Sequence, residues 1–133
     1  MSTTSPFRTL SELILEALAN MGVLAAGQPV DVEDFNYVNE KADSIFRKLA
    51  GLEIVFVADP QNIPAAWFSD LADIFAGECA TKFGIVGDAY VTMVNRGLGG
   101  AAGMEVGAGT AAKSLKIMQR AKPTYEPLRF VNY

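Results

Sequence analysis

The spacing of apolar residues between positions 31 and 51 is the feature that most constrains the fold. Apolar side chains recur there at intervals of three and four residues, at Phe35, Val38, Ala42, Ile45 and Leu49. This period matches the about 3.6 residues of an α-helical turn and not the two-residue period of a strand. The sequence therefore predicts a helix that is capped by the Asp31 carboxylate, ends at Gly51 and buries one narrow face.

A capping box marks the start of an earlier helix. The Thr9 hydroxyl can accept a hydrogen bond from the Glu12 amide, while the Glu12 side chain can accept one from the Thr9 amide. An apolar stripe follows, and Gly22 suits a left-handed exit. The stripe consists of Leu10, Ile14, Ala17 and Met21. Because a short loop around residues 27–29 joins this helix to the next, we expect the two to form an antiparallel hairpin.

Two further helices are expected in the second half of the chain. One begins near Asn62 to Pro64, with proline in its first turn, and extends to Gly84. Its predicted apolar face is Trp67, Phe68, Leu71, Ile74, Phe75 and Cys79. The last helix extends from about Thr110 to Ala121. Residues 52–58 favour a strand or an extended arm that crosses the hairpin, and residues 85–96 favour a helix or a strand.

Glycine is concentrated between positions 97 and 109, where six of the twelve glycines occur. Glycine raises the entropic cost of ordering the backbone and also permits close contacts. We therefore expect a long flexible or glycine-lined loop in this region.

These elements predict an all-α fold, a small helical bundle built on the antiparallel hairpin. Half of the 133 residues are hydrophobic, which suits one packed domain. We place the helical domain at residues 1–122, with its glycine-rich loop at about 97–109. Residues 123–133 contain two prolines and are predicted to form an extended C-terminal arm.

The sequence offers little for catalysis. It contains no histidine, and its single cysteine, Cys79, is expected to be a core residue. The segment from Gly107 to Ser114 differs from a phosphate-binding loop at Ala112, where a glycine is required, and we interpret it as a helix start that follows a loop. Acidic pairs at positions 31/34 and 70/73 suit the polar faces of helices. We therefore predict no catalytic residue, no metal site and no cofactor.

The charge is unevenly distributed. The chain carries a net −4, but residues 113–133 carry five basic residues and one acidic residue, or +4, which leaves −8 on the rest. A basic end on an acidic body suits docking onto an acidic partner, but charge alone favours a solvated helix face followed by a loose end. The end is, however, too apolar for an ordinary solvated tail, so we expect it to need a groove, either on the same fold or on a partner. The residues predicted to dock are Tyr125, Pro127, Leu128, Arg129, Phe130, Val131 and Tyr133. No apolar run approaches the roughly 20 residues needed to span a membrane, and Met1 to Arg8 lack the apolar core of a signal peptide. We therefore expect a protein that is made and kept in a reducing cytoplasm, or in a particle assembled there.

Three segments resemble the head-to-tail connector adaptors of bacteriophages, the tail accessory factors or packaged-DNA stabilisation proteins of short-tailed phages. The first is Leu13–Val23 with the loop at residues 27–29 and the following helix. The second is Ile63-Pro64 at the start of a helix that closes at residues 82–84. The third is the ending at residues 122–129. The glycine-rich stretch at residues 97–109 departs from the family pattern.

The resemblance implies a ring, typically of twelve copies, below the portal. Such a ring extends the DNA channel, and DNA passes through it without specific binding. The implied partners are the portal protein ring, neighbouring copies of the chain, and downstream tail or nozzle proteins. The implied location is the virion, assembled in the cytoplasm of the bacterial host. An acidic body suits a channel wall that DNA must pass without adhering.

Two alternatives from other functional classes stay open. One is a helical regulatory module that binds a host protein through its C-terminal end. The other is a small nucleotide-binding enzyme, based on the near match to a phosphate-binding loop.

Overall fold

The computed structural model describes residues 7–25 and 27–121 and confirms an all-α fold. Its helices are α1 (Leu10–Asn20), α2 (Val32–Gly51), α3 (Ala65–Cys79), α4 (Gly87–Arg96) and α5 (Thr110–Ala121), with a 3-10 turn, η1, at Ala80–Phe83. Two-residue strands β1 (Phe7–Arg8) and β2 (Ile63–Pro64) pair antiparallel, with Phe7 opposite Pro64.

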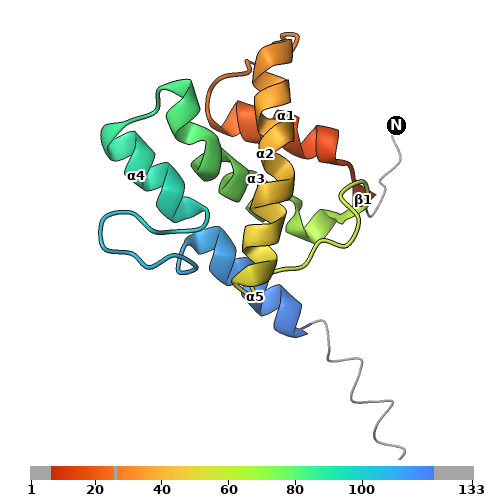
Figure 1. Cartoon of the computed structure of the whole chain (residues 1–133), viewed down its shortest axis with the longest axis vertical. Coiled ribbons are helices and arrows are strands. Elements are labelled where there is room, and N and C mark those ends of the chain that lie inside the picture. Colours follow the sequence, from red (N-terminus) through yellow and green to blue (C-terminus); the bar gives the residue numbers. More distant parts are fainter. Residues whose placement is uncertain (1–6, 26, 122–133) are drawn as a thin grey trace, which may run out of the picture.

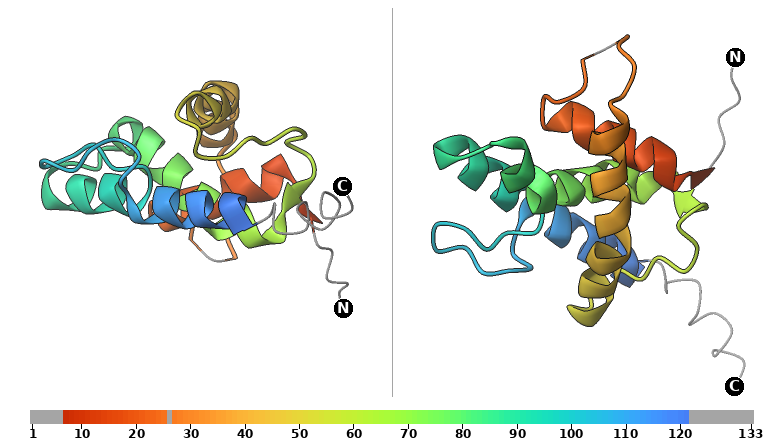
Figure 2. Two further views of the ribbon diagram at one scale, coloured as in Figure 1. Left: turned by 90° about the horizontal axis from the view of Figure 1, so that it is seen from below. Right: turned by 45° about the horizontal axis from the view of Figure 1, so that its top comes forward.

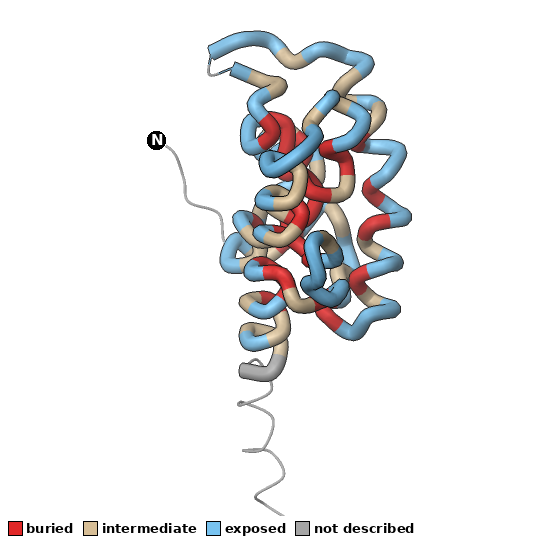
Figure 3. Tube along the Cα trace, turned by 90° about the vertical axis from the view of Figure 1, so that its left-hand side faces the viewer, coloured by how far each residue is buried: buried red, intermediate tan, exposed pale blue. Residues whose placement is uncertain are grey.

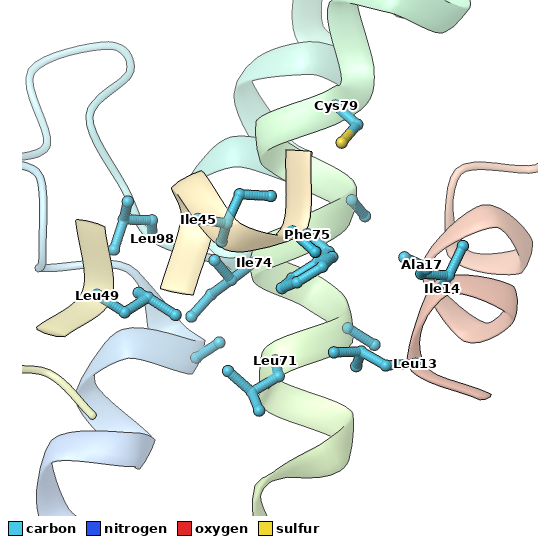
Figure 4. Packing of buried hydrophobic residues seen from close by; sticks show 14 of the residues in the cluster. Leu13, Ile14, Ala17, Ile45, Leu49, Leu71, Ile74, Phe75, Cys79 and Leu98 are labelled. Carbon is cyan, nitrogen blue, oxygen red and sulfur yellow. The ribbon is translucent and has the colours of Figure 1, made fainter. Parts of the chain in front are cut away.

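Helix α3 is the centre of the molecule and packs against α1, α2, α4 and α5 (Figure 1). The sequence predicted one apolar face for it, but the structure buries α3 on most of its circumference. Its buried residues are Phe68, Leu71, Ala72, Ile74, Phe75, Ala76, Gly77 and Cys79. Figure 4 shows Phe75 between residues of α1 and α2. Exposed segments cover the outside of this interior (Figure 3).

The predicted antiparallel hairpin of the first two helices is not confirmed. Helix α2 runs across the layer that contains α1, α3 and α5, instead of alongside α1 (Figures 1 and 2). Both helices bury the predicted apolar faces, but α1 packs mainly on α3. Since α1 and α2 are joined by residues 21–31, the connection is long enough to allow a crossing.

The predicted N-terminal caps are confirmed. The Thr9 amide donates to Glu12 Oε1 at 2.8 Å, the Glu12 amide donates to Thr9 Oγ1 at 3.3 Å, and the Glu33 amide donates to Asp31 Oδ1 at 2.8 Å. The bond from the Thr9 amide holds the pKa of the Glu12 carboxyl below its usual range. Capping by short polar side chains is local and is therefore readable from sequence.

Two other predicted helix ends are confirmed: Gly22 has the predicted left-handed conformation, at φ +78°, and α2 ends at Gly51. The left-handed residue that follows α2 is Glu53, at φ +59°. Pro64 precedes the first turn of α3 instead of lying within it. Residues 52–58 form no strand; they are a turn at residues 52–53 followed by an irregular segment, in which Ile54 and Val55 are buried.

Residues 87–96 are helical, and the glycine-rich segment that follows is lined by glycine where backbones meet. A Cβ atom on Gly97 would lie 2.7 Å from the Asp73 carbonyl oxygen and 2.9 Å from Ile74 Cα. The Leu98 side chain is buried, and its carbonyl oxygen accepts hydrogen bonds from the Gly107 and Gly109 amides at 2.8 and 3.1 Å. The glycine-lined alternative therefore describes this loop.

We expect Gly97→Ala to lower the free energy of unfolding by about 1–3 kcal/mol, because the new methyl group would push α3 and the loop apart. Gly51→Ala is the matched control, since nothing lies within 4 Å of its added Cβ atom and φ is not positive there. It should raise stability by about 0.5 kcal/mol through helix propensity. Urea denaturation measures both, and equal effects at the two positions would contradict the close approach.

Candidate docking surface

The seven residues predicted to dock, Tyr125, Pro127, Leu128, Arg129, Phe130, Val131 and Tyr133, lie outside the described residues. The boundary predicted between a domain at 1–122 and an arm at 123–133 lies there too. The candidate surface built from described residues is a different one. It lies where the glycine-rich loop meets the outer side of α5.

This surface, which we call the α5 groove, is shallow and mostly apolar. It consists of Met104, Glu105, Val106, Gly107, Ala108, Lys113, Lys116 and Ile117. Its two depressions have volumes of about 390 and 460 Å³. The Ile117 side chain is 62% exposed and Val106 is 51% exposed, so both present apolar surface to the outside. Clustered apolar exposure of this kind is typical of a protein contact site.

The backbone of the groove is fixed by internal hydrogen bonds. Lys116 Nζ donates to the Gly107 carbonyl oxygen at 3.0 Å, and Gly107 has φ +96°, which favours glycine. The Asn95 side chain accepts from the Ala101 amide and donates to the Ala101 carbonyl oxygen, both at 3.1 Å. These contacts hold the loop against α4 and α5.

Backbone hydrogen bonds within the loop argue against a phosphate-binding role for the segment from Gly107 to Ser114. Amides from this segment already donate to carbonyl oxygens: Ala108 to Glu105, Ala112 to Gly97, and Lys113 to Gly109. The Gly107 and Gly109 amides bond Leu98. A phosphate-binding loop instead directs its amides toward the ligand. The Ala112 methyl group is buried in the core, which explains an alanine at this position.

Lys113 gives the groove a positive charge. Its ammonium group makes no hydrogen bond or ion pair with residues 7–25 or 27–121, whereas that of Lys116 is engaged. Glu105 contributes a carboxylate at the loop side. Sequence reasoning missed Met104, Val106 and Ile117. One residue could have indicated the groove from sequence: Ile117 is an apolar residue on the polar side of its helix, one turn from Lys113.

A second apolar surface lies between α2 and residues 56–60. Phe46, Phe56 and Val57 line a depression of about 270 Å³, and Phe56 is largely exposed. The charged groups beside it, Asp43 and Arg47, pair with each other at 2.8 Å. This surface therefore offers apolar area without an unpaired charge.

The acidic residues of the described segments lie at the surface. No charged residue there is buried, so the −8 of residues 7–112 is exposed to solvent or lies at its edge. Asp73, one of the four acids in the predicted pairs, is partly buried, and burial raises the pKa of its carboxyl. Asn20 Nδ2 donates to Asp73 Oδ1 at 3.3 Å. No cluster of three potential metal ligands occurs among the described residues.

Comparisons with protein-family models, with curated proteins and with solved structures gave no match to this chain. The resemblance to phage adaptors therefore rests on the sequence segments named above. Within the described segments, every helix is too short or too polar to cross a bilayer.

Cys79 should be unreactive in the folded protein. Its side chain is buried, as predicted, and burial raises the pKa of the thiol to about 11. Relative to an ordinary value near 9, this lowers the thiolate fraction at neutral pH by about 100-fold. An aromatic disulfide reagent at pH 7.5 should therefore react at least that much faster in denaturant than in buffer. Comparable rates would contradict burial.

Because protonated Cys79 is favoured in the folded state, its contribution to stability is complete below about pH 9. It is lost as the pH rises toward 11.

We also expect no saturable binding of Mg-ATP, because the amides that would hold its phosphates are engaged within the protein. Isothermal titration of the full chain measures this directly. Micromolar binding that disappears in Lys113→Ala would show that the segment rearranges into a phosphate site.

Proposed function

We propose that the chain is a structural head-to-tail adaptor of a bacteriophage. In this role it forms a ring below the portal, extends the DNA channel and joins the capsid to tail components. It acts by docking, with the portal, neighbouring copies and tail proteins as partners. The basis of the proposal is the resemblance of its N-terminal helices, its Ile63-Pro64 helix start and its ending to such adaptors.

The structural observation that supports the proposal is a net acidic surface that also exposes two apolar patches. The acidic side chains of residues 7–112 are all at the surface, so a wall built from this body would repel a sliding DNA duplex. The α5 groove and the surface around Phe56 supply apolar area for protein neighbours. A body with both features suits a ring subunit that contacts proteins and lets DNA pass.

Deleting residues 125–133 should abolish binding to portal rings while leaving the fold intact. The core residues of α1, α2 and α3 lie within the described helices, so their packing does not require this segment. Removing Leu128 and Phe130 forfeits about 1.5–3 kcal/mol each if both are buried on the portal, which corresponds to a loss of about 100-fold or more. A pull-down with portal rings measures binding, and circular dichroism monitors the fold.

Arg129 provides a matched pair of point variants. If it pairs with an acid on the portal, Arg129→Glu should weaken binding more than Arg129→Ala, because the first places two like charges together. A deletion variant that folds and still binds portal rings as the full chain does would overturn the assigned role of the C-terminal residues. Portal rings that bind neither the full chain nor any variant would overturn the adaptor function.

A further inference from the structure

We propose that the α5 groove binds the chain's own C-terminal residues 123–133, lying extended and running back along α5. The C-terminal segment follows Ala121, the last residue of the helix that forms one side of the groove. The inference does not depend on the adaptor function. It concerns which surface holds this segment in the isolated protein.

The α5 groove and residues 123–133 both carry large apolar side chains that can cover one another. The groove presents Met104, Val106 and Ile117, three of the eight large hydrophobic side chains exposed in the described segments. In an extended chain alternate residues share one face, so Glu126, Leu128 and Phe130 lie on the same side. That side is one acid followed by two large apolar groups. Leu128 and Phe130 cover the apolar residues on the loop side of the groove, Met104 and Val106.

The groove and the segment also carry opposite charges. Glu126 is the sole acid in residues 122–133, and Lys113 is the groove cation that makes no ion pair with the described residues. An ion pair between the two gives each charge a partner. The surface around Phe56 fits less well, because Asp43 and Arg47 already neutralise each other there. An apolar segment with a single acid is therefore better matched to the α5 groove.

The length of the segment permits this path. Lys113 lies eight residues before Ala121, or about 12 Å back along the helix axis at about 1.5 Å per residue. Glu126 lies five residues after Ala121, which spans up to about 17 Å when extended. The difference leaves room for the chain to reverse near Pro123, a residue type that favours turns. Leu128 and Phe130 then reach the loop side of the groove.

Methyl nuclear magnetic resonance of the full chain tests the contact. In the variant Leu128→Asp/Phe130→Asp, the signals of Ile117, Val106 and Met104 should move, because the segment leaves the groove. The control variant Val131→Asp/Tyr133→Asp alters the opposite side of the extended chain and should leave them in place. Val32 and Val86, which are 69% and 73% exposed outside the groove, serve as internal references in both.

Charge exchange tests the pairing. Glu126→Lys or Lys113→Glu alone should lower the bound-to-free ratio of the segment by about two- to fivefold, the effect of an exposed ion pair. The double variant Lys113→Glu/Glu126→Lys should restore it. Groove signals that are identical in the wild type and in Leu128→Asp/Phe130→Asp overturn the proposal. Shifts that depend on protein concentration overturn it too, since the segment would then come from a second copy. Portal binding is measured in a separate experiment, so the contact in the α5 groove can be disproved without disproving the adaptor function, and the reverse also holds.

Discussion

The close approach of backbones around α3 is the constraint on which the rest of the structure depends. A Cβ atom at Gly77 would lie 3.2 Å from both the Met93 carbonyl oxygen and Val94 Cα, so α4 rests almost directly on α3. Gly97 continues the same contact beyond the end of α4. A helix that is apolar on most sides must be enclosed by its neighbours. Each of the outer helices therefore needs one apolar face, and its other face is free to carry charge.

How far the sequence predicts this fold depends on the range of each interaction. The Thr9 and Asp31 caps act within three residues, and the α2 face at Val38, Ile45 and Leu49 follows from periodicity, so both were predictable. The crossing of α2 over α1 was not, because periodicity identifies the buried face of a helix and not the direction of its partner. The central place of α3 was missed because Gly77 is in contact with residues far along the chain.

The glycine-rich loop shows how composition alone can mislead. Glycine content predicts a high cost of ordering the backbone, but here the glycines permit contacts that a side chain would block. Leu98 anchors the loop in the core, and its carbonyl oxygen accepts two amides from the far end of the same loop. The candidate groove could therefore not be predicted from the sequence, because its shape depends on a closed loop whose ends are twelve residues apart.

A groove of this construction is suited to binding an extended segment. Ordering a loop on binding consumes part of the interaction free energy, and a surface already fixed by hydrogen bonds avoids that loss. The bond from Lys116 to the Gly107 carbonyl oxygen holds the loop to α5, and this leaves Lys113 as the cation available to a ligand. Because Lys113 makes no ion pair with the described residues, an acidic ligand group is attracted to this part of a body whose net charge is negative. In the proposed contact, the shape of the groove sets the path of such a segment, and pairing of its acid with Lys113 sets its register.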